Sequence, residues 1–410
     1  MKTLDFLGLG AILCTAPMAM GADTGAPSEA RSAAATVAQD VNLFAVDLYA
    51  RLGSTEKGNL FFSPQSISTA LAMTYVGARG ETAQEMARTM HFSLSQDRLP
   101  AGYAELMHAL RGGGTQSYRL SIANRLWGQR GMSFLDAFVA VTRREFGAEL
   151  GLVDFATNAE GARGEINAWV AMETEQKIRD LIPAGVLGPD TRLVLANAIY
   201  FRGDWARQFE KSATHEQPFH VSGGTTVAVP LMFAKMTVGF GERPDVGLKV
   251  VELPYKGDDL SMLVLLPDAP DGLAEMEAQL TAESLRQWTT GLARRDVLVY
   301  LPRFSMESGF GLGSTLAAMG MPLAFSDRAD FSGMNGTRDL SISAVLHKAR
   351  VDVDEQGTEA AAATGVAVGV RAVRPEEPPT FRADHPFVFF IRHNPTGAIL
   401  FLGRLTNPKP

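Results

Sequence analysis

The side chains that most often carry out catalysis are present in this chain, but they lack the spacing that catalysis requires. The sequence contains no His-Glu-x-x-His, no Gly-x-x-x-x-Gly-Lys and no Gly-x-Ser-x-Gly, the patterns of zinc hydrolases, phosphate-binding loops and serine hydrolases. His215 and His220 are not spaced as metal ligands, and Cys14 is the only thiol. We therefore expect no enzyme, no metal site and no cofactor.

Residues 355–371 are the most informative stretch, because they alternate like a strand and then run into a solvated tail. Every second residue from Thr358 onward is small or β-branched: Thr358, Ala360, Ala362, Thr364, Val366, Val368 and Val370. This period of two is typical of a half-buried strand, but the prolines within residues 375–379 break strands. A helix capped by Thr358 also fits the alanines. The residues alone leave helix, loop and latent strand open.

The residues around this stretch follow a recognisable order. His347-Lys348 and an alternating strand precede it, and the run Asp-His-Pro-Phe at 384–387 follows it. Residues 59–68, 167–170, 195–205 and 401–404 continue the same pattern elsewhere in the chain. In this order the motifs resemble those of the serpins, serine-protease inhibitors that expose a reactive loop as bait. The matches extend from about residue 40 to residue 408, and the chain is identified as a member of the inhibitory type.

The resemblance implies a reactive bond and a hinge. The family's scissile bond follows the seventeenth residue counted from the hinge Glu, here Glu355, which gives Arg371–Ala372 as the reactive bond. Arginine fits independently, because trypsin-like pockets carry a carboxylate. Arg374 is the competing site. The hinge then comprises Glu355, Gly357, Thr358, Glu359, Ala360, Ala361, Ala362, Ala363 and Thr364.

The resemblance also implies a mechanism. A trypsin-like serine protease cuts the loop and forms a covalent complex, and the cleaved loop enters the main sheet as a strand before the acyl-enzyme is hydrolysed. From Gly357 to Val370 the inward positions carry no proline, charge or bulky group, which favours insertion. Two alternatives remain: a non-inhibitory serpin acting as a binding or carrier protein, and an unrelated secreted hydrolase.

Two polar residues within apolar strands form a second group of candidate site residues. Asn197 interrupts the apolar run 191–201, and His347 shares a face with four small or apolar residues of its strand. Buried polar groups need hydrogen-bonding partners, so a structural role is expected. In the resemblance, Ser66, Asn197 and His347 match the serpin shutter, where the main sheet parts, and Trp205 matches the breach, where insertion begins.

The remaining patterns predict an α+β fold, a single serpin-like domain of mixed β-sheets, surrounding helices and an exposed reactive-centre loop at about residues 355–380. Residues 37–52 are periodic like a helix, and Ser63-Pro64 is a helix start. Residues 191–201 suit a buried central strand. Residues 250–253 pair with 260–267, and 387–393 with 398–404. The glycines at 309–313 predict a turn before a helix.

Composition limits the partners. The net charge of −7 and the absence of a clustered Lys/Arg run argue against nucleic-acid binding. Only scattered Arg98 and Arg111 occupy the region where some serpins carry a basic helix, so no heparin-type cofactor is expected. Outside the first 22 residues, no apolar run approaches the ~20 residues of a membrane span, and we expect a monomer that does not bind membranes.

The first residues predict export. Lys2 precedes an apolar run from Phe6 to Met20, as in a signal peptide at 1–22, so the expected location is secreted or periplasmic. Residues 23–35 read as a flexible leader and 36–410 as the serpin domain. Leu13 before Cys14 does not suit a lipoprotein signal, and Cys14 is expected to leave with the signal, so that no disulfide can form.

Overall fold

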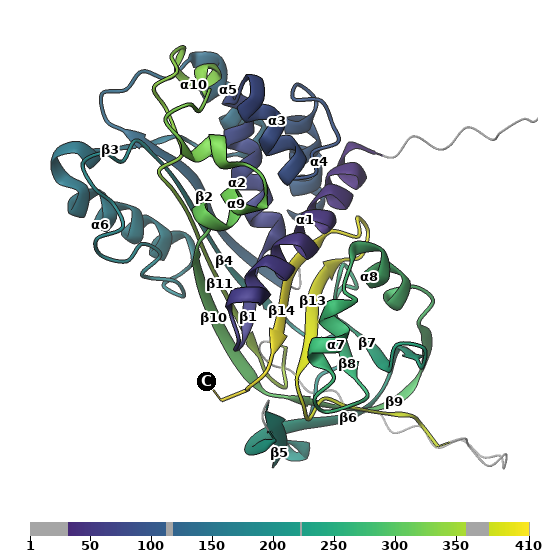
Figure 1. Cartoon of the computed structure of the whole chain (residues 1–410). Helices are drawn as coiled ribbons and strands as arrows, with labels where there is room; N and C mark the ends of the chain where they lie inside the picture. Colours follow the sequence, from purple (N-terminus) through teal and green to yellow (C-terminus); the bar gives the residue numbers. More distant parts are fainter. Residues whose placement is uncertain (1–31, 112–117, 222–223, 358–376, 410) are drawn as a thin grey trace, which may run out of the picture. The chain divides into compact units, whose positions relative to one another are not determined.

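Two β-sheets and a group of helices make up the fold (Figure 1). The computed structural model describes residues 32–111, 118–221, 224–357 and 377–409. Strands and helices follow one another without a regular βαβ repeat, which confirms the predicted α+β class. The two sheets have nine and five strands.

The nine-stranded sheet carries most of the strands from the second half of the chain. Its order is β1-β14-β13-β8-β7-β6-β9-β12, with β5 paired to β6. The bounds are β1 Leu60–Phe62, β5 His215–Val221, β6 Thr225–Arg243, β7 Leu248–Pro254, β8 Leu260–Pro267, β9 Ala293–Pro302, β12 Thr380–Arg382, β13 Phe387–His393 and β14 Ile399–Leu405. The predicted pairs β7–β8 and β13–β14 are both antiparallel neighbours, so these predictions are confirmed.

The five-stranded sheet, which we call the main sheet, has the order β10-β11-β4-β2-β3. Its strands are β2 Tyr118–Gln129, β3 Gly151–Val153, β4 Leu193–Gly203, β10 Phe304–Gly311 and β11 Ala344–Val353. β4 lies at its centre and is buried along almost its whole length, as its apolar run predicts. β11 is parallel to β4 and antiparallel to β10. We call the boundary between β4 and β11 the seam.

The helices begin where the sequence provides caps. The Ser63 side chain accepts a hydrogen bond from the backbone N–H of Ser66 at 3.2 Å, and Pro64 occupies the first helical position of α2. The α-helices are α1 Ala33–Thr55, α2 Pro64–Gly77, α3 Gly80–Thr89, α4 Leu99–Arg111, α5 Asp136–Phe146, α6 Phe155–Glu173, α7 Leu273–Ala278, α8 Ala282–Thr289, α9 Gly313–Met319 and α10 Ser332–Asn335. Short 3₁₀ turns span Lys211–Ala213 and Pro322–Phe325.

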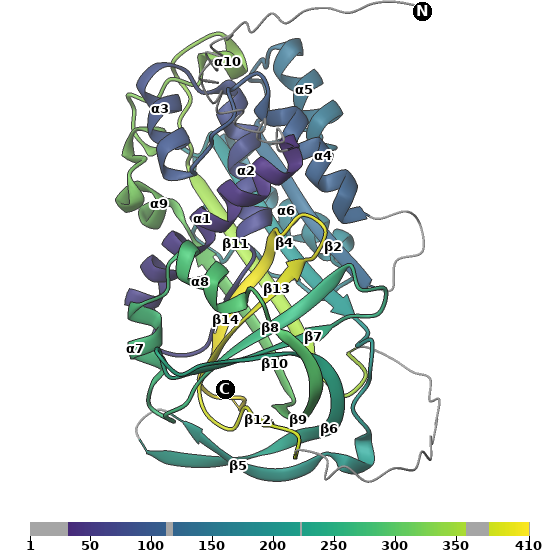
Figure 2. The same ribbon diagram turned by 90° about the vertical axis from the view of Figure 1, so that its right-hand side faces the viewer.

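The main sheet is covered on both faces (Figures 1 and 2). On one face, Ile166 and Val170 of α6 pack with Ala196 and Ala198 of β4 and with Leu346 of β11. On the other face, α2 contacts β2 and β4, and β1 contacts β10 and β11. A strand with both faces covered must be apolar throughout, which explains the composition of β4.

Two sequence expectations are wrong in detail. The leader was expected to extend to residue 35, but α1 begins at Ala33, where the Ser32 hydroxyl accepts from the N–H of Ala35 and so caps the helix. The glycines at 309–311 were expected in a turn, but they belong to β10, where Gly309 pairs with Lys348 of β11. Ladder hydrogen bonds to β11 override the local preference for a turn. The helix expected after them is present as α9.

No helix in the described ranges combines the length and apolar character needed to cross a membrane.

Candidate functional site

A network of buried polar side chains crosses the seam at its middle. His347 of β11 is paired with Asn197 of β4, and the His347 ring is hydrogen-bonded through Nδ1 to the Asn197 side-chain oxygen. The Asn197 amide donates to the Ser66 hydroxyl at 2.5 Å and to the Ser66 carbonyl at 3.1 Å. Ser63 completes the network, because its backbone N–H donates to His347 Nε2 at 3.1 Å.

These contacts set the protonation state of His347. Nε2 accepts a hydrogen bond from a backbone N–H, so the proton of the neutral ring is assigned to Nδ1, which donates to Asn197. Burial lowers the pKa of His347 to about 3, because desolvation penalises the charged ring. The network is therefore neutral and holds β11, β4 and α2 together.

A tight turn follows β11 at the end of the seam. The backbone N–H of Gly357 donates to the Asp354 carbonyl at 3.2 Å, and the N–H of Gln356 donates to the Asp354 carboxylate at 2.9 Å. Gly357 is the last described residue before the gap at 358–376. The turn thus fixes the point from which the following segment starts.

Residues just beyond β4 anchor this turn. The backbone N–H of Trp205 donates to the Gln356 carbonyl at 3.1 Å, and its indole N–H donates to the Asp354 carbonyl at 2.9 Å. The N–H of Phe209 donates to the Glu355 carbonyl at 2.9 Å. The Trp205 ring stacks on Tyr255, with 4.6 Å between ring centroids. Trp205 therefore joins the end of β4 to the segment that leaves β11.

Gly357 is required at its position on two grounds. Its φ of +76° lies in the left-handed region, which favours glycine. A Cβ there would lie 2.2 Å from the Trp205 backbone nitrogen and 2.5 Å from the Gly203 carbonyl oxygen. The backbone of the turn thus lies directly against the end of β4, at a distance that no side chain permits.

Glu355 is held by charge. Its side chain is buried and forms an ion pair with Arg303. Burial alone would raise the pKa of Glu355, but the hydrogen bonds to its carboxylate, first of all from Arg303, together with the charge of Arg303, prevail and lower it. A buried carboxylate with this partner keeps the first hinge residue in place.

The structure brings some of the predicted site residues together and leaves others outside the described residues. Ser66, Asn197 and His347 meet in one network at the middle of the seam. At its end, Trp205 donates to the carbonyls of Asp354 and Gln356 and lies against the hinge residue Gly357, while the hinge residue Glu355 is bound by Phe209. The rest of the predicted hinge (Thr358, Glu359, Ala360, Ala361, Ala362, Ala363 and Thr364) and the predicted bond Arg371–Ala372 lie outside the described residues, as does the alternative Arg374.

The sequence analysis missed Ser63 as a partner of His347, and also Arg303 and Phe209. No local signal marks them, because Ser63 lies 284 residues from His347 and Arg303 lies 52 residues from Glu355.

The contacts at the seam join β4, β11 and α2, and those beyond β4 anchor the turn that follows β11. Within the described ranges, no group of three or more His, Cys, Asp and Glu residues could hold a metal ion. The polar groups of the network are committed to one another. What the geometry does provide is a backbone position, Gly357, that lies against the end of β4, next to the seam between two parallel strands.

Comparisons with known proteins agree with this geometry. A family model described as "Serpin (serine protease inhibitor)" matches residues 39–408. The leukocyte elastase inhibitor of Bos taurus is 46% identical over 372 residues, which are 89% of this chain and 97% of that protein. Uncleaved ovalbumin matches with a TM-score of 0.82 and 30% identity over 91% of this chain and 100% of the other. Maspin matches with a TM-score of 0.84 and 31% identity, over 92% and 100%.

Proposed function

The chain belongs to the serpin family of serine-protease inhibitors, and we propose that it is a secreted inhibitor that traps trypsin-like serine proteases once per molecule. In this proposal the protease serine attacks the Arg371 carbonyl. The serine oxygen bonds to that carbon, the Arg371–Ala372 amide bond breaks, and Ala372 leaves as the new amino terminus with a proton on its nitrogen. Inhibition requires that the cleaved loop moves before water releases the acyl group.

The observation that carries the proposal is the position of Gly357. It lies against the end of β4 and follows β11 through one tight turn. A chain that turns back after β11 runs antiparallel to β11, and because β11 and β4 are parallel it also runs antiparallel to β4. Such a strand can pair with both neighbours if the seam opens. β4 has 11 residues, and the segment from Thr358 to Val370 is long enough to match it.

Opening the seam has a definite structural consequence. His347 and Asn197 are directly paired across it, so an inserted strand must separate them. The inserted side chains replace this contact, and the alternating small residues from Thr358 to Val370 can be buried there without a charge or a large group. This composition supports the inhibitory mechanism over the binding or carrier alternative.

The proposed target class, the trypsin-like proteases, rests on Arg371, which is the seventeenth residue counted from Glu355 and so precedes the bond that serpins present for cleavage. An arginine suits a protease pocket that carries a carboxylate. Secretion rests on Lys2 and the apolar run from Phe6 to Met20. The sequence alone supports these two parts of the proposal, the target class and secretion.

A second target class is favoured by the relatives, which are named leukocyte elastase inhibitors. Elastase has a small specificity pocket, and Val370 directly precedes Arg371. An elastase-type protease would then cut at Val370–Arg371, one bond earlier than a trypsin-like protease.

One experiment separates these possibilities. The purified protein is mixed with trypsin or with elastase, and the products are boiled in detergent and examined by electrophoresis and mass spectrometry. We expect a trypsin complex that survives boiling, with a released peptide that begins at Ala372. A peptide beginning at Pro375 would move the bait to Arg374, and a complex formed only with elastase, with a peptide beginning at Arg371, would favour the second class. Digestion without any covalent complex would favour a carrier protein.

A further inference from the structure

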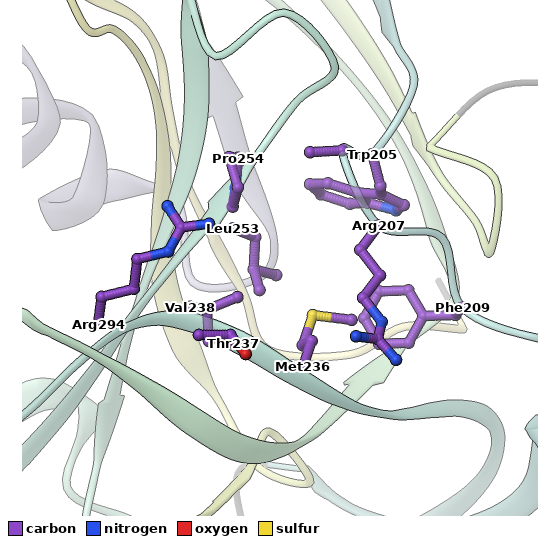
Figure 3. Close-up of a pocket in the computed structure, with 10 residues that line it drawn as sticks. Trp205, Arg207, Phe209, Met236, Thr237, Val238, Leu253, Pro254 and Arg294 are labelled. Carbon is purple, nitrogen blue, oxygen red and sulfur yellow. The ribbon is translucent and has the colours of Figure 1, made fainter. Parts of the chain in front are cut away.

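A cavity of about 210 Å³ lies beside the residues that anchor the hinge (Figure 3). Phe209, Met236, Val238 and Leu253 form much of its wall and are buried. Its volume is far larger than the ~10–15 Å³ that a single water needs. The wall is mainly apolar, so the cavity suits the body of a small organic molecule more than ordered water.

Two arginines flank this apolar wall. Figure 3 shows Arg294 on one side and Arg207 on the other, with Leu253, Val238 and Met236 between them. Both arginines are exposed. Within the described part of the chain, no hydrogen bond or ion pair engages either guanidinium, and no acidic side chain lines the cavity.

The carboxylate of Asp296 interacts with Arg207 but does not neutralise the two arginines. The charge of Arg207 contributes to lowering the pKa of Asp296, but the hydrogen bonds from Thr237 and Lys235 contribute more. Asp296 accepts from the Thr237 hydroxyl at 2.7 Å and lies 3.1 Å from the Lys235 ammonium. Two positive charges therefore remain at the rim of an apolar cavity.

We propose that this cavity binds a small amphipathic carboxylate, with its apolar body against Met236, Val238 and Leu253 and its carboxylate on Arg207 or Arg294. Guanidinium groups pair with carboxylates through two parallel hydrogen bonds. An apolar pocket with a few convergent polar groups is the usual form of a small-molecule site. The charge selects an anion, and the wall selects an apolar body.

Occupation of the cavity acts on the hinge. Trp205 and Phe209 line the cavity, and their backbone N–H groups donate to the carbonyls of Gln356 and Glu355. A ligand that packs against these two residues restricts their local opening, and hydrogen exchange of their amides reports such opening. The site is therefore placed to bias the first residues of the hinge, whether or not a protease is present.

Binding is tested by calorimetric titration of the full-length protein with 2-naphthoate, and with naphthalene-2-carboxamide as a ligand of similar shape without the charge. We expect 2-naphthoate to bind and the amide to bind roughly tenfold more weakly or not at all, as the loss of a charge-assisted hydrogen bond predicts. Arg207→Gln or Arg294→Gln should weaken 2-naphthoate by a similar factor. Arg295→Gln, at the next and also exposed residue of β9, should leave it unchanged.

The second readout is hydrogen exchange at Trp205 and Phe209, which needs no protease and is independent of the proposed inhibition. In the wild type and in Arg295→Gln, we expect 2-naphthoate to slow the exchange of both amides. In whichever of Arg207→Gln and Arg294→Gln weakens binding, we expect the amides to exchange at the ligand-free rate. No binding of 2-naphthoate, equal binding of the amide, or equal affinity in all three variants would overturn the site. Binding without any change in exchange at Trp205 and Phe209 would overturn its link to the hinge.

Discussion

At the scale of single residues, the neutral state of His347 makes the stability of the fold depend on pH. Its pKa is about 3 in the folded protein and about 6.5 in an unfolded chain. The unfolded state therefore binds more protons between these values, and stability must fall as the pH falls through this window. The contribution is fully present above about pH 6.5 and is lost progressively below it.

We predict that His347→Gln removes this dependence. At about pH 7.5 the variant should be less stable by about 1–3 kcal/mol, because a buried hydrogen-bond network is broken. At about pH 5 the wild type has lost about 2 kcal/mol from this group, so the difference between the two proteins should shrink. Denaturant unfolding at the two pH values measures this difference in the free energy of unfolding. His215→Gln, at an exposed position outside the network, is the control, and a constant difference between wild type and His347→Gln would contradict the assignment.

A second residue-scale prediction concerns Gly357→Ala. The methyl group would meet the backbone of Trp205 and Gly203 at 2.2 and 2.5 Å, so the turn must move away from β4. Gly185→Ala is a matched control, because Gly185 has a similar φ of +80° but nothing within 4 Å of its Cβ position. We expect Gly357→Ala to cost about 1–3 kcal/mol more than Gly185→Ala, in thermal unfolding. Equal melting temperatures would show that the turn tolerates displacement.

Single residues were predictable from the sequence where a pattern marked them. Asn197 and His347 stand out as polar groups in apolar strands, and the structure buries both. Their partner Ser63 and the ion pair of Glu355 with Arg303 could not be predicted, because each contact joins positions far apart in the chain. Such contacts depend on how the sheets pack, which local patterns do not encode.

At the scale of elements, the alternation of side chains from Thr358 onward leads to a paired test of insertion. Thr358→Arg places a charge on the row that is expected to face inward, and Glu359→Arg places the same charge on the outward row. Burial of an unpaired guanidinium costs several kcal/mol, whereas ~1.4 kcal/mol changes the partition of an acyl-enzyme tenfold. We expect Thr358→Arg to be cleaved by trypsin as a substrate and Glu359→Arg to retain most of its inhibition.

The fraction of molecules that form the stable complex, measured by electrophoresis against the fraction simply cleaved, decides this prediction. Equal stoichiometry for Thr358→Arg and wild type would exclude insertion in the expected register. Loss of inhibition in both variants would show that charge itself, and not the inward row, is the obstacle.

Elements were predictable to different degrees. The hairpin β13–β14 and the start of α2 follow from turn residues and a cap that act locally. Gly309 and Gly311 were misassigned to a turn, because glycine favours turns locally and the pairing with β11 that makes them a strand is long-range. The start of α1 was placed too late, because the alanines after Ser32 were counted as part of a leader rich in Ala and Ser. In the structure Ser32 caps the helix and these alanines form its first residues.

At the scale of the whole molecule, cleavage of the loop should raise thermal stability. An inserted strand can hydrogen-bond to β4 and β11 on its two sides, at about 1 kcal/mol net for each hydrogen bond, and it buries three valines at ~1.5–3 kcal/mol each. We expect protein cleaved in residues 358–376 to melt at a higher temperature than intact protein in a calorimetric scan. Cleaved Thr358→Arg should gain much less, and an unchanged melting temperature of cleaved wild type would rule out a completed sheet.

The seam between β4 and β11 also bears on how the chain reaches this arrangement. Asn197 and His347 are 150 residues apart, whereas the segment after Gly357 follows β11 almost at once. Closing the long loop costs about 3 kcal/mol more in chain entropy than forming a hairpin of a few residues. During folding, the neighbouring segment therefore competes with β4 for the same edge of β11 and has the entropic advantage of proximity. Because β11 pairs with β4 in the structure, the packing of β4 in the main sheet must outweigh this entropic advantage of the neighbouring segment.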